Sequence, residues 1–325
     1  MSRSDQVPTN SGFTGRSTGD DVLAGIDLTG RTAIVTGGYS GLGLETTRAL
    51  ARAGARVVVA VRTPEKAADS LASLEGQVET APLDLSELSS VRDFADQMVQ
   101  RLDRLDLLIN NAGIMACPLA RVGPGWESQF GVNHMGHFAL TRGLLPLLRH
   151  ADRPRVVCLS SGAHKRSDIR WDDIGYDRSP YDKWQAYGQA KTANALFANA
   201  LSRRLSDDGG RALSVHPGGI FTPLQRHLPK EEMIAFGWLG EDGEPTELAK
   251  QGFKTPEQGC STTVWAATSE LLNDKPGVYC EDCDIAEPTD PTSPMARFRG
   301  VDDHATNDES AERLWAVSED LLSRA

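Results

Sequence analysis

Tyr187 and Lys191 are the pair of side chains whose types and spacing point most directly to chemistry. They stand four residues apart in a segment with alanine, leucine and phenylalanine at helical spacing, so both lie on one face of a predicted helix. A phenol has a pKa near 10, which must fall by about 2 to 3 for proton exchange near neutrality. A lysine cation about 4 Å away supplies that change, so the pair predicts acid–base catalysis. An ordinary helix with one tyrosine and one lysine is the alternative.

Two serines add a possible hydrogen-bond donor to this pair. Ser160 and Ser161 end a predicted buried strand over residues 155–161. Ligands of open parallel sheets lie at the carboxyl ends of the strands, so a serine there can hydrogen-bond a substrate oxygen. A serine that caps a helix or forms a turn is the alternative.

A glycine-rich turn predicts a second component of the site. Residues 36–43 (Thr-Gly-Gly-Tyr-Ser-Gly-Leu-Gly) follow an apolar strand at 31–35 and precede a predicted helix at about 42–53. The glycines allow positive φ angles and a close approach to a pyrophosphate, and the helix directs free N–H groups at the anion. The turn therefore predicts dinucleotide binding. The residues expected there are Gly37, Tyr39, Ser40, Gly41, Leu42 and Gly43.

The elements that position these residues alternate between strands and helices. Further apolar strands are predicted at 55–61, 78–83 and 105–109, with a helix at about 88–102. This alternation is typical of an α/β fold, here a single Rossmann-type doubly wound parallel sheet of about seven strands with helices on both faces. Residues 1–25 are polar and predict a flexible extension, which leaves 26–325 as one domain.

The composition of the chain argues against some classes of binding partner. The net charge of −11 argues against nucleic acid or an anionic membrane, and no apolar stretch is long enough to span a bilayer. Five cysteines, an odd number, favour reduced thiols in the cytoplasm. Cys280 and Cys283 form a CxxC without a second pair, so two incidental thiols are favoured over a metal site. No metal is expected.

Several motifs in this order resemble the short-chain dehydrogenase/reductase family over roughly residues 28–285. The motifs are TGxxxGxG at 36–43, Asn110-Asn111-Ala112-Gly113, Asn133 within Gly131-Val132-Asn133-His134, Ser161, Tyr187 with Lys191, and His216-Pro217-Gly218. The chain is most similar to the retinol-dehydrogenase-like and WW-domain-oxidoreductase-like branch. Residues 130–138 and the long segment between Ser161 and Tyr187 support that branch.

The resemblance implies a role for each candidate residue. Tyr187 is the general acid/base, and Lys191 lowers its pKa and holds the nicotinamide ribose. Ser161 orients and polarises the carbonyl, with Ser160 as the runner-up. Asn133 kinks its helix and anchors a water in a proton relay to the lysine. His134, His137 and His164 are expected to pack or cap locally.

The second strand indicates which cofactor is used. It ends in Val61-Arg62 with no carboxylate, and an arginine pairs with a 2′-phosphate that an aspartate repels. Arg62 therefore predicts NADP(H), with NAD(H) as a possibility and a solvated arginine as the alternative. Asp84 matches the family aspartate beside the adenine ring, or is a simple turn residue. The remaining positions expected at the cofactor are Leu85, Asn111, Ala112, Gly113, Pro217, Gly218, Ile220 and Thr222.

The segment from about 221 to 254 resembles the lid that covers the substrate in this family. Its apolar side chains predict a hydrophobic pocket that closes on binding, with residues 114–116 as the opposite wall. The expected substrate is a bulky, mostly apolar ketone or aldehyde, or its alcohol. An amphipathic helix at about 309–323 packs on the body or on a partner subunit, so a homo-oligomer is possible.

These observations predict a cytoplasmic NADP(H)-dependent oxidoreductase that interconverts a hydrophobic carbonyl compound and its alcohol. A protein that senses NAD(P) without turnover is one alternative, although such members typically lack the tyrosine or the lysine. An NAD-dependent alcohol dehydrogenase is another. Epimerases and dehydratases of this fold are less favoured, because they carry a larger C-terminal substrate domain.

Overall fold

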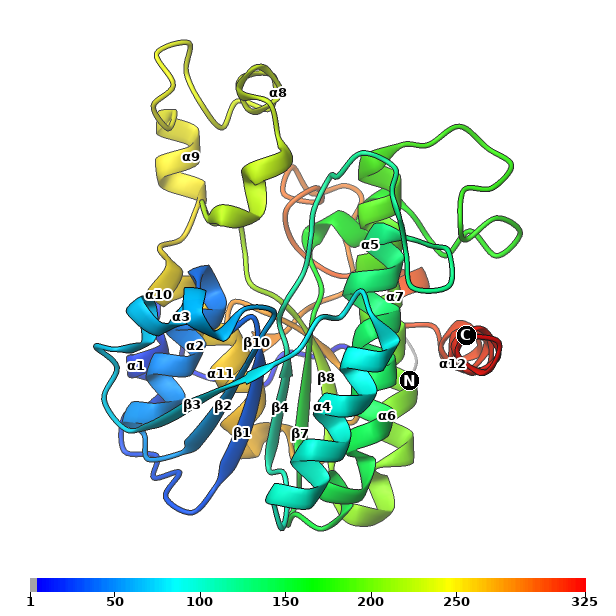
Figure 1. Ribbon diagram of the computed structural model, residues 1–325. Coiled ribbons are helices and arrows are strands. Elements are labelled where there is room, and N and C mark those ends of the chain that lie inside the picture. The colour runs from blue at the N-terminus through cyan, green and yellow to red at the C-terminus, as the bar shows by residue number, and fades with distance from the viewer. Residues whose placement is uncertain (1–4) are drawn as a thin grey trace.

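The computed structural model describes residues 5–325, and its centre is an eight-stranded sheet in the order β10-β9-β8-β7-β4-β1-β2-β3 (Figure 1). All neighbouring strands are parallel except β9 and β10. The strands are β1 (Thr32–Thr36), β2 (Arg56–Val61), β3 (Gln77–Pro82), β4 (Leu107–Asn110), β7 (Arg155–Leu159), β8 (Arg211–His216), β9 (Tyr279–Glu281) and β10 (Asp284–Ile285). A separate ribbon joins β5 (Arg121–Val122) and β6 (Trp126–Glu127).

The central strands form where the sequence is apolar on both faces. Every residue of β4 and β7 is buried, as is usual for parallel strands covered by helices on both sides. The strands at 31–35, 55–61, 78–83, 105–109 and 155–161 are confirmed within two residues of their predicted bounds. The α/β prediction is confirmed, and the strand beyond the predicted seven is the short β10.

Helices cover both faces of the sheet (Figure 1). The α-helices are α1 (Gly19–Leu23), α2 (Gly41–Arg52), α3 (Pro64–Leu71), α4 (Leu88–Arg101), α5 (Ser128–Phe130), α6 (Gly136–Arg149), α7 (Lys183–Arg204), α8 (Lys230–Ala235), α9 (Glu247–Gly252), α10 (Pro256–Gly259), α11 (Ser261–Thr268) and α12 (Asp308–Ser323). A π-helical turn, η2 (Gly131–Met135), leads into α6, and the 3-10 turns include η3 (Gly162–Arg166) and η5 (Pro223–His227).

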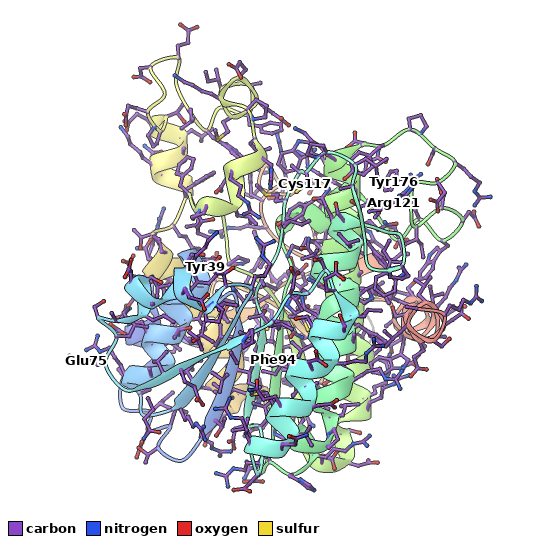
Figure 2. The ribbon with its side chains drawn as sticks, viewed as in Figure 1. Tyr39, Glu75, Phe94, Cys117, Arg121 and Tyr176 are labelled. Atoms are coloured by element: carbon purple, nitrogen blue, oxygen red, sulfur yellow. The ribbon has the colours of Figure 1, made fainter. Side chains whose placement is uncertain are left out.

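Each face of the sheet has its own apolar core. One core joins the sheet to α4, α6, α7 and α12, and Phe94 of α4 is 1% exposed within it (Figure 2). The other core lies between the sheet and α1, α2, α3 and α11. Leu314 and Trp315 place α12 in the first core, so this helix packs on the body of its own chain.

The chain direction across the sheet fixes where a ligand can bind. From β1 the chain runs outward through β2 to β3 and then returns to β4 on the other side of β1. The connections that leave the carboxyl ends of β1 and β4 run in opposite directions at this reversal, and the crevice outside these ends is the usual binding position in such folds. The lid elements η5, α8 and α9 stand above the same edge (Figure 1).

Part of the segment predicted as a flexible extension packs on the body. Val22 and Leu23 of α1 lie in the second core, and Thr18 and Asp21 form a capping box at the start of that helix. Thr9 also donates from its backbone N–H to Asp284 Oδ1 at 2.6 Å. The sequence prediction misses these few anchoring residues because the segment around them is polar. The division of the chain at residue 25 stays a prediction.

Within residues 5–325, none of the helices combines the length and the apolar character that crossing a membrane requires.

Candidate active site

A cavity of about 1500 Å³ opens at the carboxyl edge of the sheet. Tyr39 lies at this edge, below the lid (Figure 2). The cavity is lined by every residue predicted to contact the cofactor: Gly37, Tyr39, Ser40, Gly41, Leu42, Gly43, Arg62, Asp84, Leu85, Asn111, Ala112, Gly113, Tyr187, Lys191, Pro217, Gly218, Ile220 and Thr222. Ser160 and Ser161 also line it. The structure therefore brings together residues that are nearly 190 positions apart in the chain.

The glycine turn has the backbone that a phosphate cradle requires. Gly37 and Gly41 have φ angles of +65° and +53°, a backbone region that residues other than glycine rarely adopt. A Cβ on Gly43 would lie 2.3 Å from Gly37 O, so only glycine fits there. Ser40 is the N-cap of α2 and forms no side-chain hydrogen bond to the helix. The first N–H groups of α2 lie at the end of the helix next to the cavity, where they have no partner within the helix. This geometry fits a dinucleotide pyrophosphate.

Hydrogen bonds hold the ends of β1 and β4 together beside this turn. Thr36 Oγ1 accepts from the backbone N–H groups of Asn111 and Ala112, both at 2.9 Å. Asn111 Nδ2 donates to Thr36 O at 2.7 Å. Small residues from Ala112 to Gly113 then leave room for a ribose against the backbone.

Arg62 and Asp84 follow β2 and β3 at the far end of the cavity. Arg62 is exposed, and no ion pair or hydrogen bond within residues 5–325 occupies its guanidinium. Asp84 Oδ1 accepts from the backbone N–H and the hydroxyl of Ser86, at 2.9 and 2.6 Å. Asp84 therefore stabilises the turn after β3 and also lines the cavity. A turn residue and a residue beside the adenine ring are thus compatible interpretations of Asp84.

Tyr187 and Ser161 face each other at the opposite end. Tyr187 is 4% exposed, and a hydrogen bond from Ser161 acts to lower its pKa. Ser160 points elsewhere, because its hydroxyl donates to Lys191 O at 2.8 Å. This geometry favours Ser161 over Ser160 as the residue that meets a substrate oxygen.

Lys191 affects Tyr187 less than the sequence predicts. Lys191 Nζ lies 5.5 Å from the Tyr187 ring centroid and donates to Leu159 O at 2.9 Å. Burial dominates both groups: it raises the pKa of Tyr187 well above its usual value of 10 and lowers the pKa of Lys191 to about 8. The tyrosine pKa therefore shifts opposite to the expected direction, because desolvation of the phenolate outweighs the hydrogen bond from Ser161.

The burial of Lys191 predicts a pH-dependent effect on stability. Its pKa is about 8 in the fold and near 10.5 unfolded, so between these values the unfolded chain binds more protons and stability rises with pH. Lys191→Met removes the cost of burying this charge and should raise the unfolding free energy at pH 7 by about 2 to 3 kcal/mol. Leu159 O keeps a donor in Asn194 Nδ2, 2.9 Å away.

Urea unfolding of both proteins at several pH values measures this effect. The advantage of Lys191→Met should shrink as the pH rises from 8 towards 10. A variant that is less stable at pH 7, or a difference that does not change with pH, would contradict the assigned cost of burial.

Asn133 lies in the π-helical turn η2 and does not line the cavity. Its amide binds the backbone of Ile114 twice, with Oδ1 accepting from N at 2.9 Å and Nδ2 donating to O at 3.0 Å. These bonds fix the loop after β4, where Gly113 approaches Lys191 Nζ. Asn133 thus positions that loop, and its part in a proton relay stays a prediction.

The histidines that the sequence analysis treats as structural are buried. His137 Nε2 lies 2.9 Å from Thr36 Oγ1, and His134 Nε2 lies 2.8 Å from Ser318 Oγ. Burial lowers the pKa of His134 to about 3 and that of His137 to about 4, so both are neutral near pH 7. His164 contacts Tyr279 and the backbone of Ser161.

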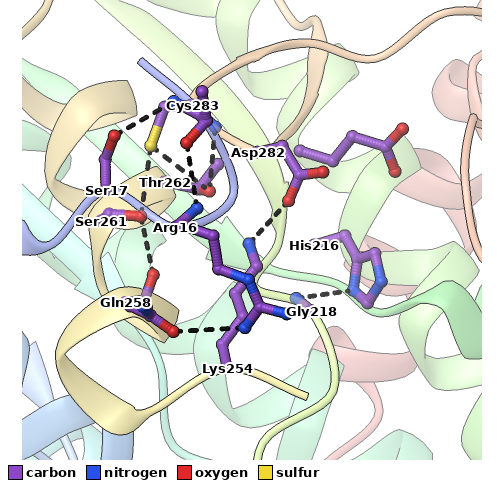
Figure 3. Close-up of polar contacts among 12 residues, drawn as sticks. Arg16, Ser17, His216, Gly218, Lys254, Gln258, Ser261, Thr262, Asp282 and Cys283 are labelled. Atoms are coloured by element: carbon purple, nitrogen blue, oxygen red, sulfur yellow. Dashed lines mark hydrogen bonds and ion pairs between the residues drawn. The ribbon is translucent and has the colours of Figure 1, made fainter. Parts of the chain in front are cut away.

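Lys254 is a cavity residue that the sequence analysis missed. Its side chain is 7% exposed, and Nζ forms an ion pair with Asp282 Oδ1 at 2.7 Å (Figure 3). It supports the turn after β8, because a Cβ on Gly218 would meet Lys254 Cε at 2.9 Å. His216 Nδ1 accepts from the backbone N–H groups of Gly218 and Gly162, which ties that turn to the residue after Ser161.

Arg16 is a second missed residue, and it joins the N-terminal segment to the end of the lid. Its guanidinium donates to Phe253 O at 2.8 Å and to Gln251 O, and it approaches Gln258 (Figure 3). Gly15 packs on Asp282, since a Cβ on it would lie 2.5 Å from Oδ1. No local pattern in the sequence links positions this far apart.

The lid forms the wall opposite residues 114–116. Leu228, Leu224, Met233 and Trp238 of the lid pack in one apolar cluster with Met115, Ala116 and Tyr187. Glu232 of α8 holds the lid to the start of α7, where it accepts from Trp184 Nε1 at 2.6 Å and pairs with Lys183. The lid therefore adds an apolar wall to the catalytic end of the cavity.

Cys280 and Cys283 are buried free thiols on β9 and at the turn to β10. Burial raises the pKa of both, so neither is a reactive thiolate near neutrality. Cys283 Sγ instead contacts Ser261 Oγ at 3.2 Å (Figure 3).

Comparison with known proteins agrees with this geometry. A family model described as short chain dehydrogenase matches residues 31–233. A probable oxidoreductase of Streptomyces lividans is 45% identical over 303 residues, which cover 92% of this chain and 99% of that protein. Retinol dehydrogenase 12 of Mus musculus is 36% identical over 302 residues, 91% of this chain and 88% of the relative.

Among solved structures, the Pseudomonas aeruginosa RhlG/NADP active-site complex is similar, with a TM-score of 0.60 and 27% identity. The likeness covers 78% of this chain and 95% of that one. The motifs, the sheet order and these matches agree, and the chain belongs to the short-chain dehydrogenase family, in its retinol-dehydrogenase-like branch.

Proposed function

We propose that this protein is an NADP(H)-dependent oxidoreductase that interconverts a hydrophobic ketone or aldehyde and its alcohol. One observation carries the proposal: Tyr187, Ser161 and Lys191 line the same cavity as the glycine turn of α2. A bound nicotinamide supplies or accepts the hydride, which no protein side chain can do. The residues of the chain then bind, orient and move protons.

In the direction of reduction, Tyr187 acts as the acid. Its raised pKa keeps the phenol protonated near neutrality, so a proton is available for the carbonyl oxygen. Ser161 donates a hydrogen bond to the same oxygen and stabilises the charge that develops there. Lys191, with its pKa of about 8, is placed to hold the ribose hydroxyls beside Gly113.

The apolar wall supports a bulky, mostly apolar substrate. Met115, Leu228 and Trp238 pack in one apolar cluster with Tyr187 and offer apolar surface to such a substrate. A cytoplasmic location is part of the proposal, because all five cysteines are free and buried, as in a reducing compartment.

The preference for NADP(H) rests on Arg62. An unpaired guanidinium at the end of β2 can form two hydrogen bonds with a 2′-phosphate. Arg62→Asp should therefore weaken NADPH binding by about 10- to 100-fold and leave NADH binding much less affected.

Fluorescence titration with both cofactors measures this change, with Arg92→Asp, an exposed arginine of α4 away from the cavity, as the matched charge control. Unchanged NADPH affinity in Arg62→Asp would show that Arg62 is only a solvated strand-end residue. Preference of the native protein for NADH would favour the NAD-dependent alternative.

A further inference from the structure

The cavity has the opposite charge balance to the chain. The full chain holds 34 lysines and arginines against 45 acidic residues. The cavity lining holds nine lysines and arginines against three acidic residues, Asp84, Glu281 and Asp282. Such a concentration of cations in an acidic protein indicates anionic ligands.

Most of these cations have partners or an assigned role. Lys254 pairs with Asp282, Lys165 pairs with Asp302, and Arg62 faces the predicted 2′-phosphate position. Arg166 and Arg297 differ, because no hydrogen bond or ion pair among residues 5–325 involves either guanidinium. Each contacts aromatic rings instead.

Arg166 stands at the substrate end. It ends η3, the turn that follows Ser161, and its guanidinium carbon lies 5.0 Å from the Trp184 ring centroid and 5.8 Å from that of Phe236. The ring centroid of Trp184 lies in turn 6.3 Å from that of Tyr187. Glu232, the nearby carboxylate of the lid, is already engaged by Lys183 and Trp184, so Arg166 keeps its donors free.

Arg297 belongs to the 295–299 loop, which lines the same cavity. Lys165, next to Arg166, donates to Arg299 O at 3.0 Å, so this loop lies against η3. Met295 and Phe298 are 44% and 56% exposed, and the Arg297 guanidinium carbon is 5.8 Å from the Phe298 ring. The loop thus presents apolar surface and an unpaired guanidinium together.

We propose that the substrate is an amphipathic carbonyl compound whose apolar or aromatic body ends in an oxyanion group such as a carboxylate, which Arg166 and Arg297 bind. The proposal rests on the proposed function and narrows its substrate class. The Arg166 guanidinium lies over the Trp184 and Phe236 rings, so it loses little freedom on binding. Each guanidinium can offer a carboxylate two parallel donors. The lid and Tyr187 then meet the apolar body and the carbonyl.

The test compares keto acids with their methyl esters, which replace the charged carboxylate by a neutral group that is larger by one methyl. A series of benzoylalkanoates, from benzoylbutyrate to benzoylheptanoate, is offered with saturating NADPH or NADH, and kcat/KM is measured. The best acid should exceed its ester by about 10- to 100-fold, mainly through KM. Arg166→Gln and Arg297→Gln should each lower kcat/KM for the acid about 10-fold and leave the ester within about 2-fold.

Arg178→Gln, an exposed arginine outside the cavity, is the control and should change neither substrate. The proposal fails when esters are used as well as acids throughout the series, or when Arg166→Gln slows acid and ester equally. The second result, together with weaker NADPH binding, would assign Arg166 to the cofactor instead.

Calorimetry with phenylvalerate and its uncharged amide separates this proposal from the proposed function, since neither probe has a ketone or aldehyde group to reduce. Binding of phenylvalerate that Arg166→Gln removes would support the anion site even without turnover of any ketone. Turnover of esters without acid preference would retain the oxidoreductase and reject the anion site. Failure of both binding and turnover would reject both.

Discussion

Tyr187→Phe should keep its affinity for NADPH and lose turnover by about 100- to 10,000-fold, which is the usual contribution of a positioned acid. The phenylalanine ring preserves the apolar contacts with Met115 and Leu228, so the fold and the cavity should persist. Only the hydroxyl that faces Ser161 is removed. The expected loss therefore lies in kcat rather than in cofactor binding.

Oxidation of NADPH at 340 nm against a panel of hydrophobic ketones and aldehydes measures the loss, and a fluorescence titration measures the cofactor affinity. Tyr176→Phe is the matched control. Tyr176 lies on the loop before α7, outside the cavity, and its hydroxyl has no hydrogen-bond partner within the described chain (Figure 2). Turnover retained in Tyr187→Phe would remove the assigned proton donor.

Gly43→Ala should nearly abolish dinucleotide binding. The new Cβ would lie 2.3 Å from Gly37 O and 2.6 Å from Asn111 Nδ2, so α2 must move away from the turn that it follows. Asn111 Nδ2 cannot retreat without losing its hydrogen bond to Thr36 O, and Gly37 O belongs to the backbone of the turn. Overpacking of this kind costs about 1 to 3 kcal/mol of stability and misplaces the N–H groups at the phosphates.

Titration with NADPH and a thermal melt in its absence separate the two effects. Gly252→Ala provides the control, since a Cβ there meets no atom within 4 Å. We expect Gly43→Ala to bind NADPH at least about 10-fold more weakly, whereas the control should bind normally. Normal NADPH affinity in Gly43→Ala would mean that the phosphates lie elsewhere.

The sequence predicts those elements whose signal is local. The strand predicted at 155–161 contains the continuous apolar run 156–159, and the turn at 36–43 requires glycines at defined places. Both are therefore visible without knowledge of the fold. The capping box that the structure shows at Thr255 and Gln258 is a local feature of the same kind. Because the motifs occur in the same order as in the short-chain dehydrogenase/reductase family, these elements are expected at one edge of the sheet.

Contacts between distant segments leave no local pattern. The ion pair of Lys254 with Asp282 and the bonds from Arg16 to the lid depend on how far loops extend after the sheet has formed. The same limit explains Val22 and Leu23, whose polar neighbours predict a flexible segment although α1 buries both. Tertiary packing decides each of these positions.

Electrostatics at the site also depends on the fold. The spacing of four residues places Tyr187 and Lys191 on one helix face. It does not reveal that the Lys191 ammonium group donates a hydrogen bond to Leu159 O. Nor does it reveal how fully both groups are buried. The sign of the tyrosine pKa shift was therefore wrong, although the pairing of the two residues in one cavity holds.

Transfer of deuterium is the most direct measurement of hydride chemistry in this cavity. Purified protein is supplied with NADPH that carries deuterium at C4 of the nicotinamide and with a hydrophobic ketone, and the alcohol is analysed by mass spectrometry. We expect one deuterium on the carbinol carbon, delivered from only one of the two C4 positions, and no label in Tyr187→Phe. An alcohol without deuterium, or label that enters equally from both positions, would contradict the account.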